Sequence, residues 1–165
     1  MKTHLALATA CLLIALPAAA QTPAPVAQEF VNKVAVSDMF EIQSSQLALT
    51  EKQPDKDTKP FAQRMVKDHQ KTAAELKKLV ESGKVQATLP TALDSDHTKM
   101  LDELKMKTGK EFDQSYDQIQ VKAHQDAVAL FEAYAKAGDN AELKKWAANT
   151  LPHLKQHLAM AQKLK

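Results

Sequence analysis

The scarcity of glycine is the feature of this sequence that most restricts its fold. The 165 residues contain three glycines, Gly83, Gly109 and Gly138, and each follows a stretch with helical periodicity. Strand-rich folds with tight hairpins need turn residues at much shorter intervals, so the pattern argues against them. Glycine in these places is typical of a helix C-terminus, because it adopts a left-handed backbone at little cost. We therefore predict an all-α protein.

Apolar periodicity and these stop signals predict four long helices and one short one. The long helices are expected over residues 26–51, 59–82, 110–136 and 140–164, and the short helix over 95–107. The first two long helices are joined by a short connection, as are the last two, so each pair should be antiparallel. The longer middle connection contains the short helix. The predicted architecture is an antiparallel four-helix bundle with a short extra helix in the long connection.

The N-terminus has the pattern of a secretory signal peptide. Lys2 supplies a positive charge, an apolar run extends from Leu5 to Leu16, and small residues follow at 18–20. The run is too short for a membrane span. We predict cleavage after residue 20, so that residues 1–20 are the signal peptide and 21–165 form a single domain. The protein is then expected in the periplasm, with secretion as an alternative.

A lipoprotein signal that ends at Cys11 is another interpretation of the same segment, but it would leave a very short apolar core. Cys11 is the only cysteine of the chain and would be removed with the signal peptide. The mature protein would therefore have neither disulfides nor thiolate metal ligands.

The remaining composition excludes several classes of function. The chain has 22 basic and 20 acidic residues, and Arg64 is the only arginine. Without a concentrated basic face, nucleic-acid binding is not expected. No segment after the signal peptide is apolar over the length that a transmembrane helix needs. No Gly-x-Ser-x-Gly sequence and no other hydrolase motif occurs, so we predict a role without catalysis.

Each predicted long helix carries an ionisable residue on or beside its apolar face. Glu41 lies ten residues before residue 51, and His69 lies ten residues after residue 59. His124 lies about 12 residues before residue 136, and His153 lies about 13 residues after residue 140. All four groups should therefore lie in one layer of the bundle. His157 is one turn further along.

Two interpretations of this layer follow from the residue types. In the first, the candidate ligands Glu41, His69, His124, His157 and His153 converge on a metal ion. Imidazoles and a carboxylate suit Zn, Cu or Fe, although no cofactor is certain from the sequence. In the second, Glu41 accepts hydrogen bonds from His69 and another histidine, and serines and Tyr116 complete a buried structural network. The sequence does not decide between them.

A second apolar strip, Val36, Phe40 and Leu47, lies on the opposite side of the first helix. We expect the short helix or the long connection to cover it. Left uncovered, it would be a surface for a protein partner or for self-association.

Four local patterns together resemble a known bacterial family. They are "SDMFEIQSSQLAL", "PFAQRMVKDHQKTAAEL", "EFDQSYDQIQVKAHQDAVALFEAYA" and "LPHLKQHLAMA". The chain is similar, from about residue 28 to residue 164, to the secreted ferritin-like helical proteins of the domain of unknown function 4142 family.

This resemblance implies export and a ferritin-like four-helix fold, but no established activity. It carries over Glu41, His69, His124 and His157, and so favours His157 over His153. The Glu-x-x-His pairs of di-iron bundles are absent, because Val66 and Val121 stand three residues before His69 and His124. The expected function is a non-catalytic binding or stress-related accessory role; the alternative is a metal-binding protein or metal-dependent oxidoreductase that uses the Glu/His layer.

Overall fold

The computed structural model describes residues 26–52 and 54–164. Within these ranges no strand occurs, and the regular structure consists of helices, which confirms the all-α class. The elements are α1 (Ala27–Leu47), a π-helical turn η1 (Ala48–Lys52), α2 (Thr58–Glu81), α3 (Ser95–Lys105), α4 (Gly109–Ala137) and α5 (Ala141–Ala161). All five predicted helices are therefore present, with ends shifted by a few residues. The predicted signal peptide lies outside the described residues, and the domain division stays a prediction.

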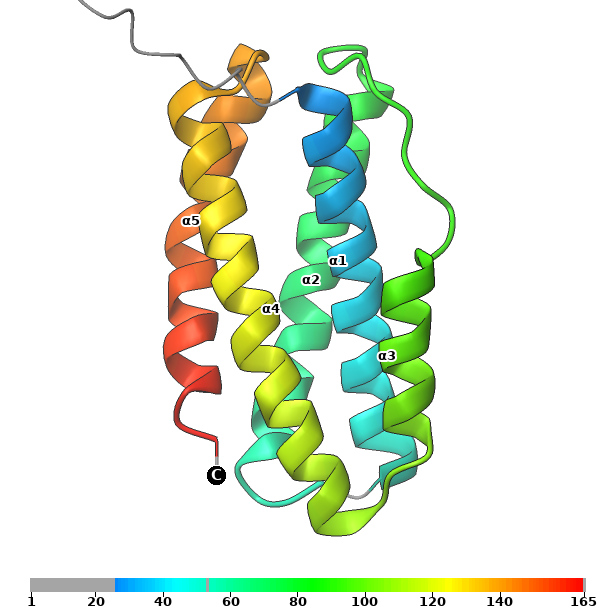
Figure 1. Ribbon diagram of the computed structural model, residues 1–165. Helices are drawn as coiled ribbons and strands as arrows, with labels where there is room; N and C mark the ends of the chain where they lie inside the picture. Colours follow the sequence, from blue (N-terminus) through cyan, green and yellow to red (C-terminus); the bar gives the residue numbers. More distant parts are fainter. Residues whose placement is uncertain (1–25, 53, 165) are drawn as a thin grey trace, which may run out of the picture.

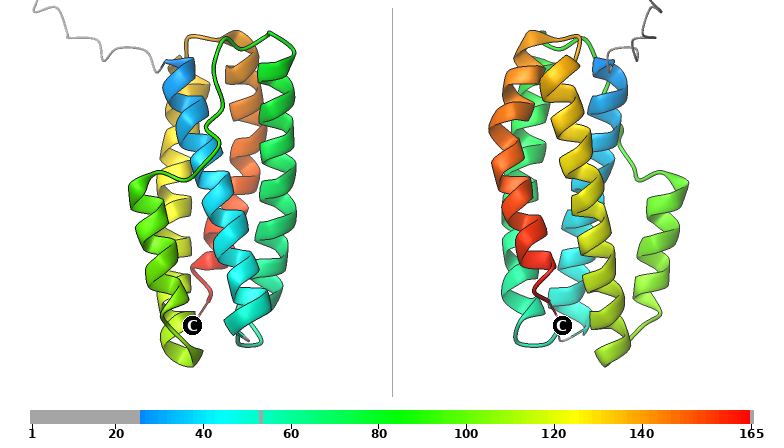
Figure 2. Two further views of the ribbon diagram at one scale, coloured as in Figure 1. Left: turned by 90° about the vertical axis from the view of Figure 1, so that its right-hand side faces the viewer. Right: turned by 60° about the vertical axis from the view of Figure 1, so that its left-hand side comes forward.

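The four long helices lie side by side, and α3 lies against the outside of α1 (Figure 1). The chain runs down α1, up α2, up α4 and down α5, so α2 and α4 point in the same direction. The connection between α2 and α4 returns along the length of the molecule and contains α3 (Figure 2). α1 packs mainly on α2, and α4 packs mainly on α5. Among the described residues, no helix combines the length and apolar character that a membrane span requires.

The three glycines have different structural roles. Gly83 and Gly109 have positive φ angles of 73° and 52°, as expected at the ends of helical segments, since glycine has no Cβ to clash in this conformation. The expectation of a left-handed backbone at Gly138 was wrong, because its φ is −58°. Gly138 instead gives room to the ring of Tyr134: a Cβ at position 138 would lie 2.5 Å from that ring.

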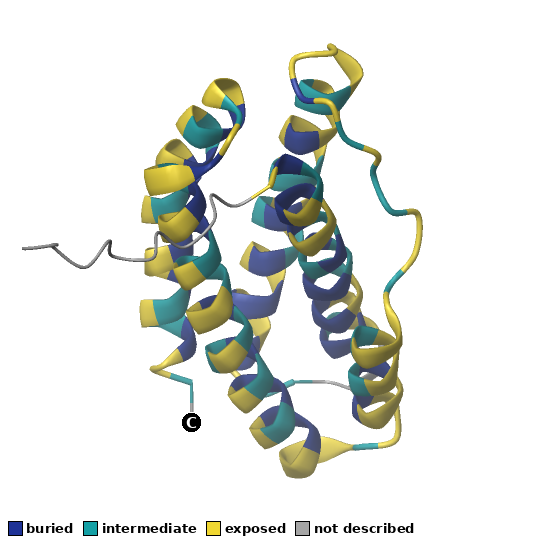
Figure 3. Ribbon diagram, turned by 45° about the horizontal axis from the view of Figure 1, so that its top comes forward, coloured by how far each residue is buried: buried dark blue, intermediate teal, exposed yellow. Residues whose placement is uncertain are grey.

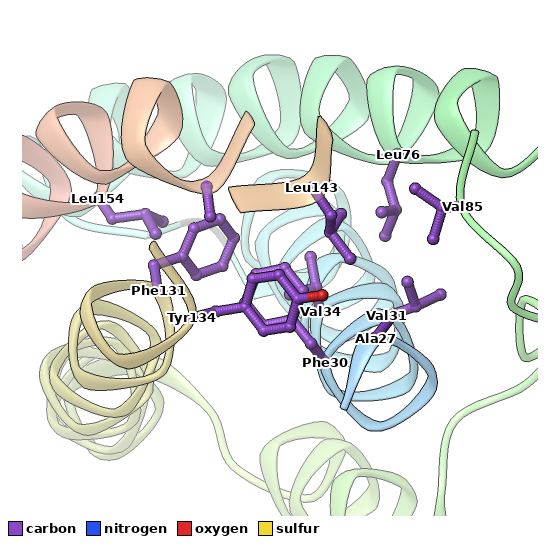
Figure 4. Packing of buried hydrophobic residues seen from close by; sticks show 11 residues of the cluster. Ala27, Phe30, Val31, Val34, Leu76, Val85, Phe131, Tyr134, Leu143 and Leu154 are labelled. Atoms are coloured by element: carbon purple, nitrogen blue, oxygen red, sulfur yellow. The ribbon is translucent and has the colours of Figure 1, made fainter. Parts of the chain in front are cut away.

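The buried residues lie mainly on the sides of the long helices that face one another (Figure 3). The apolar ones form two clusters, one toward each end of the bundle. The first cluster includes Phe30, Phe131 and Tyr134, with the rings of Phe30 and Tyr134 stacked at a centroid distance of 4.1 Å (Figure 4). The second contains Phe40 and Leu47 together with Leu101, Leu104, Phe112 and Tyr116. Burial of such side chains is the main favourable contribution to folding.

The second apolar strip of α1 is covered in this arrangement. Val36, Phe40 and Leu47 are all buried, and Phe40 and Leu47 share a cluster with Leu101 and Leu104 of α3. The prediction that the short helix covers the strip is confirmed for Phe40 and Leu47. Self-association through it, which would require α3 to move away, stays a prediction.

Candidate metal centre

Three histidines from three helices meet in the layer between the two apolar clusters. His69 of α2, His124 of α4 and His157 of α5 are all buried, and one nitrogen from each ring lies within 4.8 Å of the other two. The ring centroids are 5.6 Å apart for His69 with His124, 5.6 Å for His69 with His157, and 5.4 Å for His124 with His157. The separations are nearly equal, so the rings surround a common point.

The helical period explains why these rings face inward. Residues separated by about one or two turns lie on the same face of a helix. His69 comes four residues after Met65 and seven before Leu76, both fully buried. His157 likewise lies between the buried Leu154 and Ala161 on α5. Each histidine thus lies on the apolar stripe of its own helix. The side-by-side packing of α2, α4 and α5 then places the three histidines at the same height in the bundle.

Each of the three rings uses one nitrogen for a hydrogen bond on its outer side. His69 Nδ1 lies 2.7 Å from Asp38 Oδ1, His124 Nδ1 lies 2.8 Å from the backbone carbonyl oxygen of Gln120, and His157 Nε2 lies 2.9 Å from Asp68 Oδ2. Histidines that bind metals in proteins nearly always have such a carboxylate or carbonyl partner, which fixes the ring orientation.

These partners determine the tautomer of two rings. A carbonyl oxygen only accepts, so His124 carries its proton on Nδ1. Burial acts to raise the pKa of Asp68, but hydrogen bonds from His157 and Arg64 outweigh it and leave that pKa below the ordinary value. Asp68 is therefore an ionised acceptor, and His157 donates from Nε2. For His69, a cation at Nε2 would favour the tautomer with the proton on Nδ1.

The inner nitrogens have no hydrogen-bond partner among the described residues. They are His69 Nε2, His124 Nε2 and His157 Nδ1, all shielded from solvent. Buried polar atoms without partners cost free energy, and at least two of these present lone pairs toward the same point. A cation that accepts those lone pairs would remove the cost.

Burial also keeps the rings of His69 and His157 uncharged. It lowers the pKa of His69 to about 4, although the nearby Glu41 carboxylate acts in the opposite direction. Burial lowers the pKa of His157 to about 4 as well, against a hydrogen bond to Asp68 that acts to raise it. At neutral pH both imidazoles are neutral, which is the form that binds metal ions.

Two of the five predicted ligands are placed differently. Glu41 is buried beside this layer, but its carboxylate is not part of the group of three nitrogens, and neither of its oxygens has a hydrogen-bond partner within residues 26–52 and 54–164. The hydrogen-bonded network predicted around Glu41 is therefore not formed, since His69 pairs with Asp38 and Tyr116 pairs with Ser45 at 2.7 Å. His153 is exposed, so helical periodicity past Pro152 turns it away from the layer.

The family model for the domain of unknown function DUF4142 matches residues 14–164, which is most of the chain. This chain belongs to the DUF4142 family. The predicted membership is confirmed, and the match extends over every helix that the structure describes.

Among solved structures, the DUF4142 domain is similar to one described as "CopM in the Cu(II)-bound form". The TM-score is 0.69 at 16% sequence identity, over 86% of this chain and 96% of that chain. At this identity the likeness shows a shared fold. A search of curated proteins found no match.

Three residues that support the histidines of the DUF4142 domain were missed by reasoning from the sequence. They are Asp38, Asp68 and Gln120, which hold the outer sides of the rings. A signal existed for Asp38, because it lies three residues before Glu41 and so shares its helix face. Gln120 acts through its backbone, so no side-chain pattern could have found it.

Proposed function

We propose that this DUF4142 protein binds one transition-metal ion, copper(II), through His69, His124 and His157. The observation that carries the proposal is the set of three buried inner nitrogens, which lack hydrogen-bond partners while the outer nitrogen of each ring is held by an acceptor. In this interpretation the protein is an accessory protein that holds the ion, in agreement with the lack of a catalytic motif.

Two arguments favour copper(II) as the bound ion. Neutral imidazoles bind Cu, Zn, Ni and Fe, and divalent copper binds such a nitrogen set most tightly among the first-row metals. The similar solved structure is described as Cu(II)-bound, which motivates the same ion here. Zinc is the alternative ion, because it also accepts three imidazoles.

The carboxylates around the layer could balance the charge of a divalent cation. Glu41 is 1% exposed and Asp38 is 2% exposed, and each has at least one oxygen without a partner. Burial raises the pKa of Asp38 well above its ordinary value. A buried charge is costly unless an opposite charge lies near it, so a cation among the rings would favour the ionised form of Asp38.

We also propose that the fold is a ferritin-like bundle and that the protein is periplasmic. Long helices α2 and α4 run in the same direction with a crossover between them, as ferritin-like folds require. The N-terminal signal pattern supports export. Iron storage or di-iron oxidation does not follow, because the centre lacks the bridging carboxylates of those proteins.

Titration of purified, metal-free protein with Cu²⁺ tests the proposal. We expect one ion per chain by calorimetry and by elemental analysis after desalting, and nitrogen hyperfine coupling in the copper electron paramagnetic resonance spectrum. His157→Ala should weaken binding at least about 100-fold, because it removes one of three ligands. His153→Ala is the matched control on the same helix and should leave affinity unchanged. Equal loss in both variants, or wild-type protein that binds no copper, would contradict the proposal.

A further inference from the structure

A cavity of about 720 Å³ opens between α1, α3, α4 and the segment that precedes α3. Much of its lining is apolar, including Val34, Val36, Phe40, Met100, Ile119 and Leu130. Cavities of about 300–1,000 Å³ with mostly apolar walls and a few polar groups are typical of sites for small organic molecules. The size and lining of this cavity therefore suit an organic ligand.

Helix pairing and small side chains explain why this space is not filled. α1 is paired with α2 and α4 with α5, so α1 and α4 approach each other less closely than the members of each pair. Small side chains then line the cavity where larger ones could have filled it: Ser37 on α1, and Ala123 and Ala127 one turn apart on α4. Side chains of the α3 region, among them Met100 and His97, complete the wall.

The charged groups around the cavity are mostly paired with one another. Lys122 pairs with Asp126, and His97 Nδ1 lies 2.7 Å from Asp94 Oδ1. Asp38 differs, because it is 2% exposed and its Oδ2 has no hydrogen-bond partner among the described residues. Its other oxygen bonds to His69, which also lines the cavity. The cavity thus has an apolar body and a buried hydrogen-bond acceptor in its wall.

We infer that this cavity binds a small aromatic or alicyclic molecule that carries a hydrogen-bond donor, such as an amine or hydroxyl. The apolar body would lie among Val36, Phe40 and Ile119, and the donor would bond to Asp38 Oδ2. The inference goes beyond metal binding and does not rest on it. His69 lines the cavity, but His124 and His157 do not, so the cavity is distinct from the space among the three rings.

Fluorescence titration of the metal-free full chain with 1-aminoanthracene tests the inference. This probe is a flat apolar molecule with one amine donor, and its emission rises in an apolar site. We expect saturable binding of one molecule per chain at concentrations below about 100 μM, as for a site of modest affinity. A linear, unsaturated signal over that range would overturn the inference.

Two variants with the same substitution locate the binding site. Ala123→Phe places a ring in the cavity and should weaken binding at least about tenfold. Ala133→Phe changes an exposed residue of the same helix and should leave binding unchanged. Circular dichroism melting checks that each variant folds. Met100→Trp fills the cavity from α3 and replaces Ala123→Phe if the latter does not fold. Equal affinity in the filled variant and the wild type would contradict the site.

The role of Asp38 is tested by competition against the bound probe. The competitors 1-naphthylamine and 1-methylnaphthalene have the same shape, but the first has a donor where the second has a methyl group. Asp38→Asn can place an amide donor where the acceptor was. The substitution should therefore weaken the binding of 1-naphthylamine about tenfold and change the affinity for 1-methylnaphthalene by less than about twofold. An equal effect on both competitors would show that Asp38 does not recognise the donor.

Discussion

Asp38 Oδ1 of α1 lies 2.7 Å from His69 Nδ1 of α2, and this contact orients a ring whose other nitrogen faces two further histidines. Through this contact α1, which contributes no histidine to the layer, is connected to the candidate metal centre. Glu41, the residue of α1 that the sequence favoured as a ligand, makes no hydrogen bond with its carboxylate in the part of the chain that the structure describes. The contribution of α1 to the centre is therefore a supporting one.

Replacing Asp38 by asparagine should weaken copper binding without changing its stoichiometry. The amide keeps a hydrogen bond to His69 but supplies no negative charge, and loss of such a supporting carboxylate typically costs about 10–100-fold in metal affinity. Calorimetric titration with Cu²⁺ measures the change. Asp96→Asn, a substitution at an exposed site on α3, is the control and should bind like the wild type. Wild-type affinity in Asp38→Asn would show that the contact does not support the ion.

Glu41→Met should have opposite effects on the metal-free and copper-bound proteins. Without metal, the substitution replaces a buried carboxyl group that lacks partners with an apolar side chain of similar size, so the free energy of unfolding should rise by about 1–3 kcal/mol. With copper, it removes a compensating charge and should weaken binding about tenfold or more. Urea denaturation of the metal-free protein and calorimetry with Cu²⁺ measure the two effects. A change of the same sign in both experiments would contradict this role of Glu41.

Asp117 should make the metal-free protein less stable as pH rises. Burial, with the charges of Asp55 and Asp113, raises the pKa of Asp117 to about 6, despite a hydrogen bond from Thr58. In the unfolded chain this pKa is about 4, so between pH 4 and 6 the folded protein binds the extra proton and loses that stabilisation as the pH increases.

Asp117→Asn removes this ionisation. Relative to the wild type, the variant should gain about 2 kcal/mol at pH 7.5, and the difference should vanish near pH 4. Urea denaturation of both proteins at a series of pH values checks the prediction. A difference that is constant with pH would mean that ionisation of Asp117 is not its cause.

Gly138→Ala should destabilise the protein through crowding against Tyr134. The added Cβ would lie 2.5 Å from the ring, which is stacked on Phe30 and cannot move freely, and overpacking of this kind costs about 1–3 kcal/mol. Thermal unfolding measures the loss. In a Tyr134→Ala background the same substitution should cost much less, because the clashing ring is gone. Gly83→Ala, where no atom lies within 4 Å of the added Cβ, tests backbone strain alone.

The helices could be predicted because each element of this fold is specified locally. Apolar spacing and the glycines predicted all five helices, and counting residues from the connections predicted the common height of His69 and His124. The same count placed His153 in the layer and His157 one turn away, and only the family resemblance favoured His157. The direction of side chains near the edge of a helix face could not be predicted. His153 and His157 differ by one turn, yet the first is exposed and the second buried. The buried positions of α5 alternate at spacings of three and four residues, at Thr150, Leu154, His157 and Ala161, and His153 lies just beside this stripe.

Pairing between helices was the other part that could not be predicted. Periodicity places Asp38 and Glu41 on the same face of α1. Which of the two carboxylates bonds to His69 depends on how α1 packs on α2, and residue spacing does not determine this packing. The support of His124 by the backbone of Gln120 depends on a side-chain rotamer, which residue spacing does not determine.

The histidine layer joins two helical hairpins that otherwise pack chiefly within themselves. His69 belongs to the α1–α2 hairpin, and His124 and His157 belong to the α4–α5 hairpin. An ion held by all three would act as a cross-link at mid-height between these halves. Copper loading would then increase the force needed to separate the two hairpins, even when that force acts on surfaces far from the ion.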